Sequence, residues 1–260
     1  MSVTYGEYLC LDHVLNAQKP RSSDEHDEML FIVIHQTYEL WFKQILHEYE
    51  SLVIGMQEDN AFRVLSDLQR ILVIMKSLVK QIDVLETMKP MSFLGFRKNL
   101  GTSSGFQSVQ FRAIEFSLGH KKRQSIDQLN STDEEKQKLE KLWMQPSLFD
   151  HLLLWIERSD PGSVPEDVLG RDVTQTYKGD ERVEDLILEL YKKNDFFSLI
   201  FEHLMDWDEG LQEWRYRHVK LVERTMGGVR GTGGSAGIEY LKKSLFRPSF
   251  PDLWNLRAKF

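Results

Sequence analysis

Apolar side chains recur at three- and four-residue steps along most of the chain, which is the period of an α-helix. The run from Glu28 to Val53 contains no proline or glycine, and one of its faces carries Phe31, His35, Tyr38, Phe42, Ile45, Tyr49 and Leu52. Ser22 and Glu25 just before this run predict a capping box. A second stripe from Ala61 to Leu85 has nearly heptad spacing, which is typical of helices packed almost antiparallel.

Residues 87–105 interrupt this pattern with Lys89-Pro90 and a glycine at each end of 101–105, so we expect a loop that carries Phe93, Phe96 and Arg97. Beyond it the pattern predicts helices over 106–118, 133–145, 147–158, 183–206 and 208–226, and then a glycine-rich loop over 227–237 and a last short helix. No segment alternates with the period of a strand, and no repeat or interdomain linker is visible. The sequence therefore predicts one all-α domain, a single helical bundle over 1–260.

Composition narrows the classes of function. Hydrophobic residues make up 41% of the chain and charged residues 28%, which is ordinary for a globular protein. The net charge of −7 gives no sign of a nucleic-acid partner, because a protein that binds nucleic acid usually presents a basic face to it. Cys10 is the only cysteine, which excludes a disulfide framework and a cysteine-rich metal site. No apolar run approaches the ~20 residues of a membrane span, and the N-terminus lacks the features of a signal peptide. We therefore expect a cytoplasmic protein with no membrane partner.

Two histidines are placed to carry chemistry. His35 lies one turn after Phe31 on the apolar part of its helix, and His218 lies on a stripe with Leu211, Trp214 and Leu221. A histidine in such a place is more often a core residue that is bonded to a carbonyl. Two buried histidines on separate helices nevertheless suggest haem, because histidine is a common axial ligand of haem iron. A zinc site is disfavoured because His47-Glu48 lacks the second histidine of HExxH.

Arg97 and the glycine-rich loop could bind a polar ligand. Arg97 has aromatic neighbours, which suit a bidentate clamp for a carboxylate, although it could equally be a surface arginine that packs its stem. The run from Gly231 to Ala236 formally fits GxGxxA, but it follows a helix and has no βαβ unit around it, so a dinucleotide site is excluded. Such a loop still allows a ligand to approach the backbone closely, with the Thr232 hydroxyl within the same loop.

Five motifs carry a resemblance to a known family, and they follow the family's order along the chain. They are Tyr5-Gly-Glu-Tyr8-Leu, HDEMLFIVIHQTYELWFK over 26–43, GFQSVQFR over 105–112, Arg217-His218 and GTGGS over 231–235. The chain resembles the tryptophan 2,3-dioxygenases. This resemblance implies a haem domain of the tryptophan/indoleamine dioxygenase type. Such a domain cleaves the indole C2–C3 bond of L-tryptophan with O2 to give N-formyl-L-kynurenine, the first step of tryptophan degradation by the kynurenine pathway.

The resemblance also implies roles for individual residues. His218 matches the axial ligand of the iron of haem b (iron protoporphyrin IX), which is ferrous in the active form. His35 matches the catalytic histidine that faces the indole nitrogen and contacts the substrate. Arg97 matches the arginine that binds the substrate carboxylate. The remaining substrate-binding positions are Phe31, Phe93, Leu100, Ser104 and Thr232, with Tyr5 and Tyr8 reaching from residues 1–20 into a neighbouring subunit of a homotetramer.

Other activities remain open at this point. A haem enzyme of the same fold that oxygenates another indole amino-acid derivative needs only a modest change of pocket, because such a change is worth about 1–3 kcal/mol of discrimination. A non-catalytic haem sensor is the other alternative. The presence of His35, Arg97 and Thr232 together argues against a sensor, which needs no clamp for a carboxylate.

Overall fold

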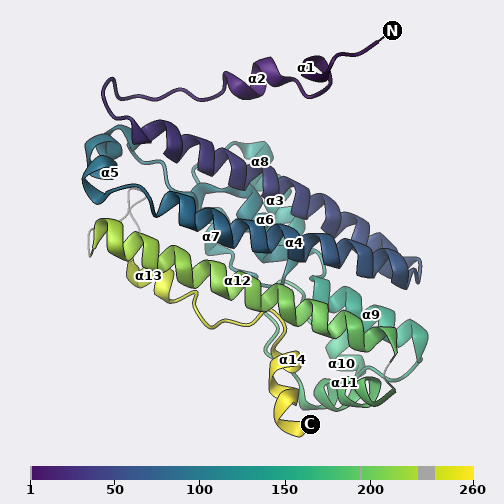
Figure 1. The fold of residues 1–260 in the computed structure, drawn as a ribbon. Coiled ribbons are helices and arrows are strands. Elements are labelled where there is room, and N and C mark those ends of the chain that lie inside the picture. The colour runs from purple at the N-terminus through teal and green to yellow at the C-terminus, as the bar shows by residue number, and fades with distance from the viewer. Residues whose placement is uncertain (1, 194, 228–237) are drawn as a thin grey trace.

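Three long helices form the centre of the computed structural model, which describes residues 2–193, 195–227 and 238–260. They are α3 (Asp27–Gln57), α4 (Ala61–Leu85) and α12 (Phe196–Met226), and α4 packs against both of the others (Figure 1). The stretch from Glu28 to Val53 and the stripe from Ala61 to Leu85 both form the helices predicted for them. No described residue lies in a strand, so the all-α prediction is confirmed.

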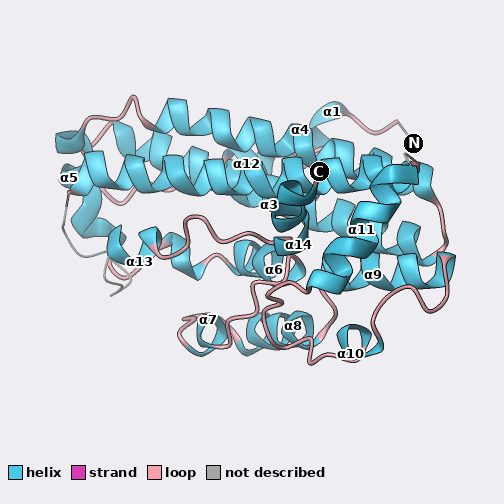
Figure 2. Ribbon diagram, turned by 90° about the horizontal axis from the view of Figure 1, so that it is seen from below, coloured by secondary structure: helices cyan, strands magenta, loops and turns pink. Residues whose placement is uncertain are grey.

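Shorter helices cover the long ones (Figure 2). They are α5 (Pro90–Arg97), α6 (Val109–Ser117), α7 (Gln124–Asp127), α8 (Asp133–Met144), α9 (Leu148–Ser159), α10 (Glu166–Leu169), α11 (Glu181–Lys193), α13 (Ile238–Lys242) and α14 (Pro251–Asn255). Three 3₁₀ turns, η1 (Lys98–Leu100), η2 (Gly105–Gln107) and η3 (Leu256–Lys259), complete the described elements. Among the described residues, no helix is long and apolar enough to cross a membrane.

Three local predictions are wrong. The expected break near residue 207 does not exist, because α12 runs unbroken from Phe196, and Asp195 caps its start by accepting a hydrogen bond from the Phe197 N–H at 2.9 Å. The expected loop around Arg97 is the helix α5, which has Pro90 in its first turn. The capping box is absent at the start of α3, since Ser22 donates its hydroxyl hydrogen to Glu28 instead.

Most buried apolar side chains form one core between α3, α4, α9, α11 and α12, and a smaller second core lies under α6, α7 and α8. The second core consists of Ala113, Phe116, Ile126, Leu129 and Leu139. Asp208 of α12 is fully buried and accepts hydrogen bonds from the Ser249 N–H at 2.8 Å and from the Trp254 indole at 2.9 Å. This carboxylate attaches the C-terminal segment to the middle of α12.

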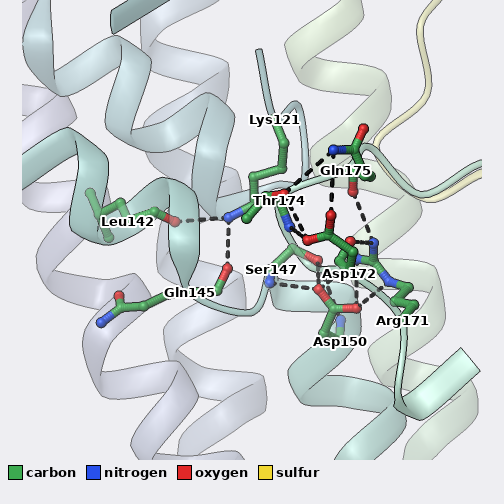
Figure 3. Close-up of polar contacts among 9 residues, drawn as sticks. All are labelled: Lys121, Leu142, Gln145, Ser147, Asp150, Arg171, Asp172, Thr174 and Gln175. Atoms are coloured by element: carbon green, nitrogen blue, oxygen red, sulfur yellow. Dashed lines mark hydrogen bonds and ion pairs between the residues drawn. The ribbon is translucent and has the colours of Figure 1, made fainter. Parts of the chain in front are cut away.

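A polar cluster fixes the junction of α8 and α9 (Figure 3). The ammonium of Lys121 donates to the carbonyls of Leu142 and Gln145 at 2.8 and 2.7 Å, so it closes the C-terminal end of α8. Asp150 of α9 accepts two hydrogen bonds from the Arg171 guanidinium at 2.8 and 2.7 Å. Burial lowers the pKa of Lys121 to about 8. These charged groups form their hydrogen bonds within the protein, so the cluster has a structural role.

The N-terminal segment lies apart from the bundle (Figure 1). Its helices α1 (Tyr5–Tyr8) and α2 (Leu11–Leu15) contain no buried residue. The segment meets α3 where the Gln18 amide donates to the Gln36 side chain at 2.6 Å. Its apolar side chains are therefore left without cover by the described part of this chain.

Candidate active site

His35 is held by its own helix in a defined protonation state. Its Nδ1 lies 2.7 Å from the carbonyl oxygen of Phe31, one turn earlier on α3. A carbonyl oxygen can only accept, so Nδ1 carries the hydrogen and donates it. Burial lowers the pKa of His35, although this hydrogen bond and the charge of Glu39 oppose the effect. The ring is therefore neutral at pH 7, and the lone pair on Nε2 is left to accept a hydrogen bond from a ligand.

An aromatic cluster surrounds this imidazole. The ring of Phe31 lies 4.0 Å from that of His35, measured between centroids, and 5.9 and 5.4 Å from those of Phe93 and Phe96. Phe93 and Phe96 belong to α5, whose buried face packs against α3. The structure thus brings Phe31, His35 and Phe93 together, as the sequence led us to expect. Phe96 is an additional member of this aromatic cluster, whereas the sequence indicates it only as a neighbour of Arg97.

Arg97 is the last residue of α5 and lies one turn after Phe93, so the two side chains leave the same face of that helix. The Arg97 side chain is half-buried and follows Phe96, a member of the aromatic cluster, directly in sequence. Leu100 follows directly in η1 and packs against the main core. Ser104 caps η2 and accepts a hydrogen bond from the Phe106 N–H at 3.3 Å.

His218 lies on α12, and its ring stacks on that of Trp214 with 5.3 Å between the centroids and 4° between the planes. Burial, together with a smaller effect of the charge of His35, lowers the pKa of His218 to about 4. The ring of Trp214 also lies 6.0 Å from that of Tyr38, which joins this part of α12 to the turn of α3 that follows His35. No described residue forms a hydrogen bond with the His218 ring.

Trp214 was expected only as a member of the His218 stripe, and its role as a stacking partner was missed. Its ring also contacts Tyr38, Phe42 and Phe111 at centroid distances of 6.0, 6.4 and 5.1 Å. The four-residue spacing of Trp214 and His218 was the available signal, because side chains at that spacing lie over one another on a helix.

Tyr5 and Tyr8 are not part of this cluster within the described part of the chain. The side chains of Tyr5 and Tyr8 are 76% and 80% exposed on the N-terminal segment. Thr232, with the rest of the GxGxxA run, lies outside the described residues. The site can therefore be traced on this chain through α3, α5 and α12.

The donor set fits a haem with one histidine ligand. His218 presents a neutral imidazole that no described side chain engages, next to aromatic and apolar surface and near a second neutral imidazole. A neutral imidazole is the form that binds iron. Over the described part of the chain, no group of three or more His, Cys, Asp or Glu side chains is arranged to hold a metal ion. His218 is thus the candidate ligand for an iron that a porphyrin brings to the site.

Comparison with known proteins identifies the family of the chain. The model of the family described as tryptophan 2,3-dioxygenase matches residues 1–195 and 184–260. A protein named tryptophan 2,3-dioxygenase from Herpetosiphon aurantiacus is 47% identical over 258 residues, which cover 99% of this chain and 98% of that protein. Proteins of the same name from Anaeromyxobacter sp. (strain K) and Bacillus anthracis are 44% and 42% identical, each over 99% of this chain and over 96% and 93% of their own lengths.

Proposed function

The chain belongs to the tryptophan 2,3-dioxygenase family, and from this premise we propose how its own residues hold the cofactor and the substrate. The activity is that of the family: a haem-dependent oxidoreductase that cleaves the indole ring of L-tryptophan with dioxygen to give N-formylkynurenine. The observation that carries the assignment of residues is the chain of ring contacts from His218 through Trp214 to Tyr38, which brings together the parts of α12 and α3 that carry His218 and His35.

His218 is the axial ligand of haem b in this proposal. Its stacking on Trp214 restricts rotation of the ring. The reduced haem supplies the activation of dioxygen. All other tasks fall to the protein, which binds the amino acid, orients its indole ring and excludes solvent.

His35 accepts the indole N–H through Nε2, because its Nδ1 hydrogen is engaged by the Phe31 carbonyl. This hydrogen bond orients the C2–C3 bond of the indole. It also places a proton acceptor next to the indole nitrogen, which carries the N–H hydrogen. Phe31 and Phe93 pack against the faces of the indole, with Leu100 and Ser104 completing the wall beyond α5.

The charged end of the amino acid needs partners, because an unpaired charge in an apolar pocket is costly. Arg97 supplies the guanidinium for the α-carboxylate, and its place at the end of α5 separates it from His35 by the width of the aromatic cluster. Thr232 is proposed to contact the ammonium and carboxylate groups. A substrate held at both ends in this way is oriented along its whole length.

Residues 1–260 form one haem domain in this proposal, and its N-terminal segment, residues 1–20, completes the site of a neighbouring subunit in a homotetramer. The support is the exposure of the N-terminal segment, where Val3, Tyr5, Tyr8 and Leu15 are all more than 60% exposed. Such a segment would fray unless it is covered by another subunit. Deletion of residues 1–8 should therefore weaken both assembly and catalysis, and a fully active monomer in light scattering would contradict this. A cytoplasmic location stays a prediction, which fractionation of cells tests.

His218→Ala tests the assignment of the ligand. The variant should fold but purify with little haem, and added imidazole should restore binding because it replaces the missing side chain. His203→Ala is the matched control, because His203 lies on the same helix and its Nδ1 bonds the Leu199 carbonyl at 2.8 Å. Haem content and the Soret band are measured for both. Native haem content and an unchanged Soret band in His218→Ala would exclude His218 as the ligand.

A further inference from the structure

Two arginines that shortly precede His218 in sequence, Arg215 and Arg217, connect α12 to two different helices. Arg215 Nη2 lies 3.0 Å from the carboxylate of Glu115 on α6. Arg217 Nη2 lies 2.6 Å from Asp83 Oδ1 and 3.1 Å from Glu86 Oε2, both at the end of α4. The turn of α12 that carries the proposed ligand is thus attached to the bundle at two points.

The two attachments lie on nearly opposite sides of the helix. Successive residues of an α-helix are rotated by about 100°, so Arg215 and Arg217 leave the axis about 200° apart. His218 lies in the sector between them, about 60° from Arg215 and about 100° from Arg217. Rotation of α12 about its axis, in either sense, would draw both guanidinium groups away from their carboxylates.

The attachment to α6 is buried. Arg215 is 5% exposed and Glu115 is 8% exposed, and Glu115 also receives Arg112 Nη1 at 2.5 Å. Arg112 in turn lies over the rings of Phe106 and Phe111. Loss of one partner from such a group leaves a buried charge without compensation, so the contact is strongly directional. The attachment to α4 is partly exposed, since the Arg217 side chain is 26% exposed.

We propose that Arg215 and Arg217 are positioning residues that fix the rotation of α12 and thereby aim the imidazole of His218 at the haem iron. The inference rests on the proposed function, in which His218 is the ligand. Side chains extend about 5–6 Å from a helix axis, so a roll of about 10° displaces the ring by about 1 Å. A displacement of that size at a reacting centre has a large effect on rate.

Lys220 offers a matched control on the same helix. Its ammonium lies 2.8 Å from Glu223, which belongs to α12 as well. An ion pair within one helix turns with that helix and cannot resist its rotation. Lys220→Gln therefore removes a positive charge close to His218 without removing an attachment to another helix.

The test uses Arg217→Gln, the double variant Asp83→Asn/Glu86→Gln and the control Lys220→Gln, all as holoenzymes. Arg217 is preferred to Arg215 because its partly exposed pair can be removed without leaving a buried charge. Two readouts are independent of turnover: the rate of haem transfer to an acceptor apoprotein, and the iron–histidine stretching band of the reduced protein in resonance Raman spectra. We expect haem loss about tenfold faster in the first two variants, with a shifted or broadened band.

Further variants separate positioning from a general loss of stability. Arg217→Lys should restore the native band, because an ammonium can still pair with Asp83. Combining Arg217→Gln with the double variant should add only the loss of the longer Arg224–Glu86 pair, whose atoms lie 3.6 Å apart, because the Arg217 attachment is already lost in both. A native band and a native rate of haem loss in Arg217→Gln, as in Lys220→Gln, would overturn the inference.

The same measurements distinguish failure of the ligand assignment from failure of the positioning role. If His218→Ala keeps the iron–histidine band, the assignment of His218 fails. If His218→Ala loses the band while Arg217→Gln behaves like Lys220→Gln, only the positioning role fails.

Discussion

Removal of the indole N–H should expose the role of His35 directly. The benzothiophene analogue of L-tryptophan has a sulfur atom in place of that group and is otherwise similar in shape. Since His35 donates its Nδ1 hydrogen to Phe31, only the lone pair of Nε2 faces the ligand, and the analogue leaves it buried without a partner. An unsatisfied buried acceptor costs about 1–3 kcal/mol, so native enzyme should bind L-tryptophan about 5- to 150-fold more tightly than the analogue.

The assay compares dissociation constants of the two ligands, followed by the change they cause in the haem absorption spectrum. His35→Ala removes the acceptor, so the preference for L-tryptophan should shrink toward unity, and the variant should keep some turnover of L-tryptophan if His35 only positions it. Complete loss of turnover would favour an obligatory base, since general-base catalysis contributes about 10²–10⁴-fold. An undiminished preference in His35→Ala would refute the reasoning.

The same experiment has a predicted dependence on pH. Burial lowers the pKa of His35 below the ordinary 6.5, so the neutral, accepting form predominates at pH 7 and above and persists into mildly acidic solution. Protonation at lower pH turns Nε2 into a donor and removes the acceptor. The preference for L-tryptophan should therefore be constant from pH 8 to pH 7 and disappear only on acidification. Loss of the preference on raising the pH would have the wrong sign for this mechanism.

Three further predictions concern other parts of the molecule. Arg97→Lys keeps the charge but loses the planar guanidinium, so KM for L-tryptophan should rise strongly. Native enzyme should use tryptamine, which lacks the carboxylate, very poorly. Equal kcat/KM of native enzyme for both substrates would exclude Arg97 as the clamp. Burial raises the pKa of Asp252 from 3.8 to about 6, so its ionisation opposes folding and the free energy of unfolding falls as the pH rises from about 4 through 6. About 1.4 kcal/mol of this fall lies between pH 5 and pH 8, so Asp252→Asn should reduce the difference in urea unfolding between these two pH values by about that amount, and an unchanged difference would contradict it. A Cβ on Gly95 would meet only the carboxylate of Glu25, the far end of a flexible side chain that can move aside, so the helix propensity of alanine, about 1 kcal/mol better, should prevail and Gly95→Ala should raise the melting temperature. A lower melting temperature would be evidence that Glu25 is held in place.

The bounds of a helix could be predicted closely where its apolar stripe is uninterrupted. The stripe from Ala61 to Leu85 has no breaker, and α4 has those same bounds. Asp208 lies inside α12, although aspartate competes with the helix backbone and favours helix ends. In the structure its carboxylate instead accepts hydrogen bonds from the C-terminal segment, so a contact 41 residues away in sequence explains an aspartate inside a helix.

The helix α5 shows the same difficulty at smaller scale. Eight residues with Pro90 at the start and Gly95 inside resemble a loop when they are considered alone. Gly95 is accounted for only when Glu25 is seen against it, and Glu25 reaches it from the segment that precedes α3. No local pattern contains that information.

For the candidate site, pairs within one helix were predictable and pairs between helices were not. The one-turn spacing of Phe31 and His35 and the four-residue spacing of Trp214 and His218 both became ring contacts. The approach of Arg97 to the aromatic cluster depends on how α5 packs against α3, which only the family resemblance anticipated. The roles of Tyr5, Tyr8 and Thr232 stay predictions.

The distribution of the two histidines along the chain has a consequence for the order of folding. His35 lies on α3, which a turn of three residues joins to its packing partner α4, so this antiparallel pair needs only local loop closure. His218 lies on α12, which begins more than a hundred residues after α4 ends and must dock against it across that separation. Contacts distant in sequence form slowly, so we expect the α3–α4 hairpin to form early and α12 to dock late. A chain emerging from the ribosome would then complete its porphyrin-binding surface only after nearly all of it has been synthesised, which protects it from capturing the cofactor before the fold can retain it.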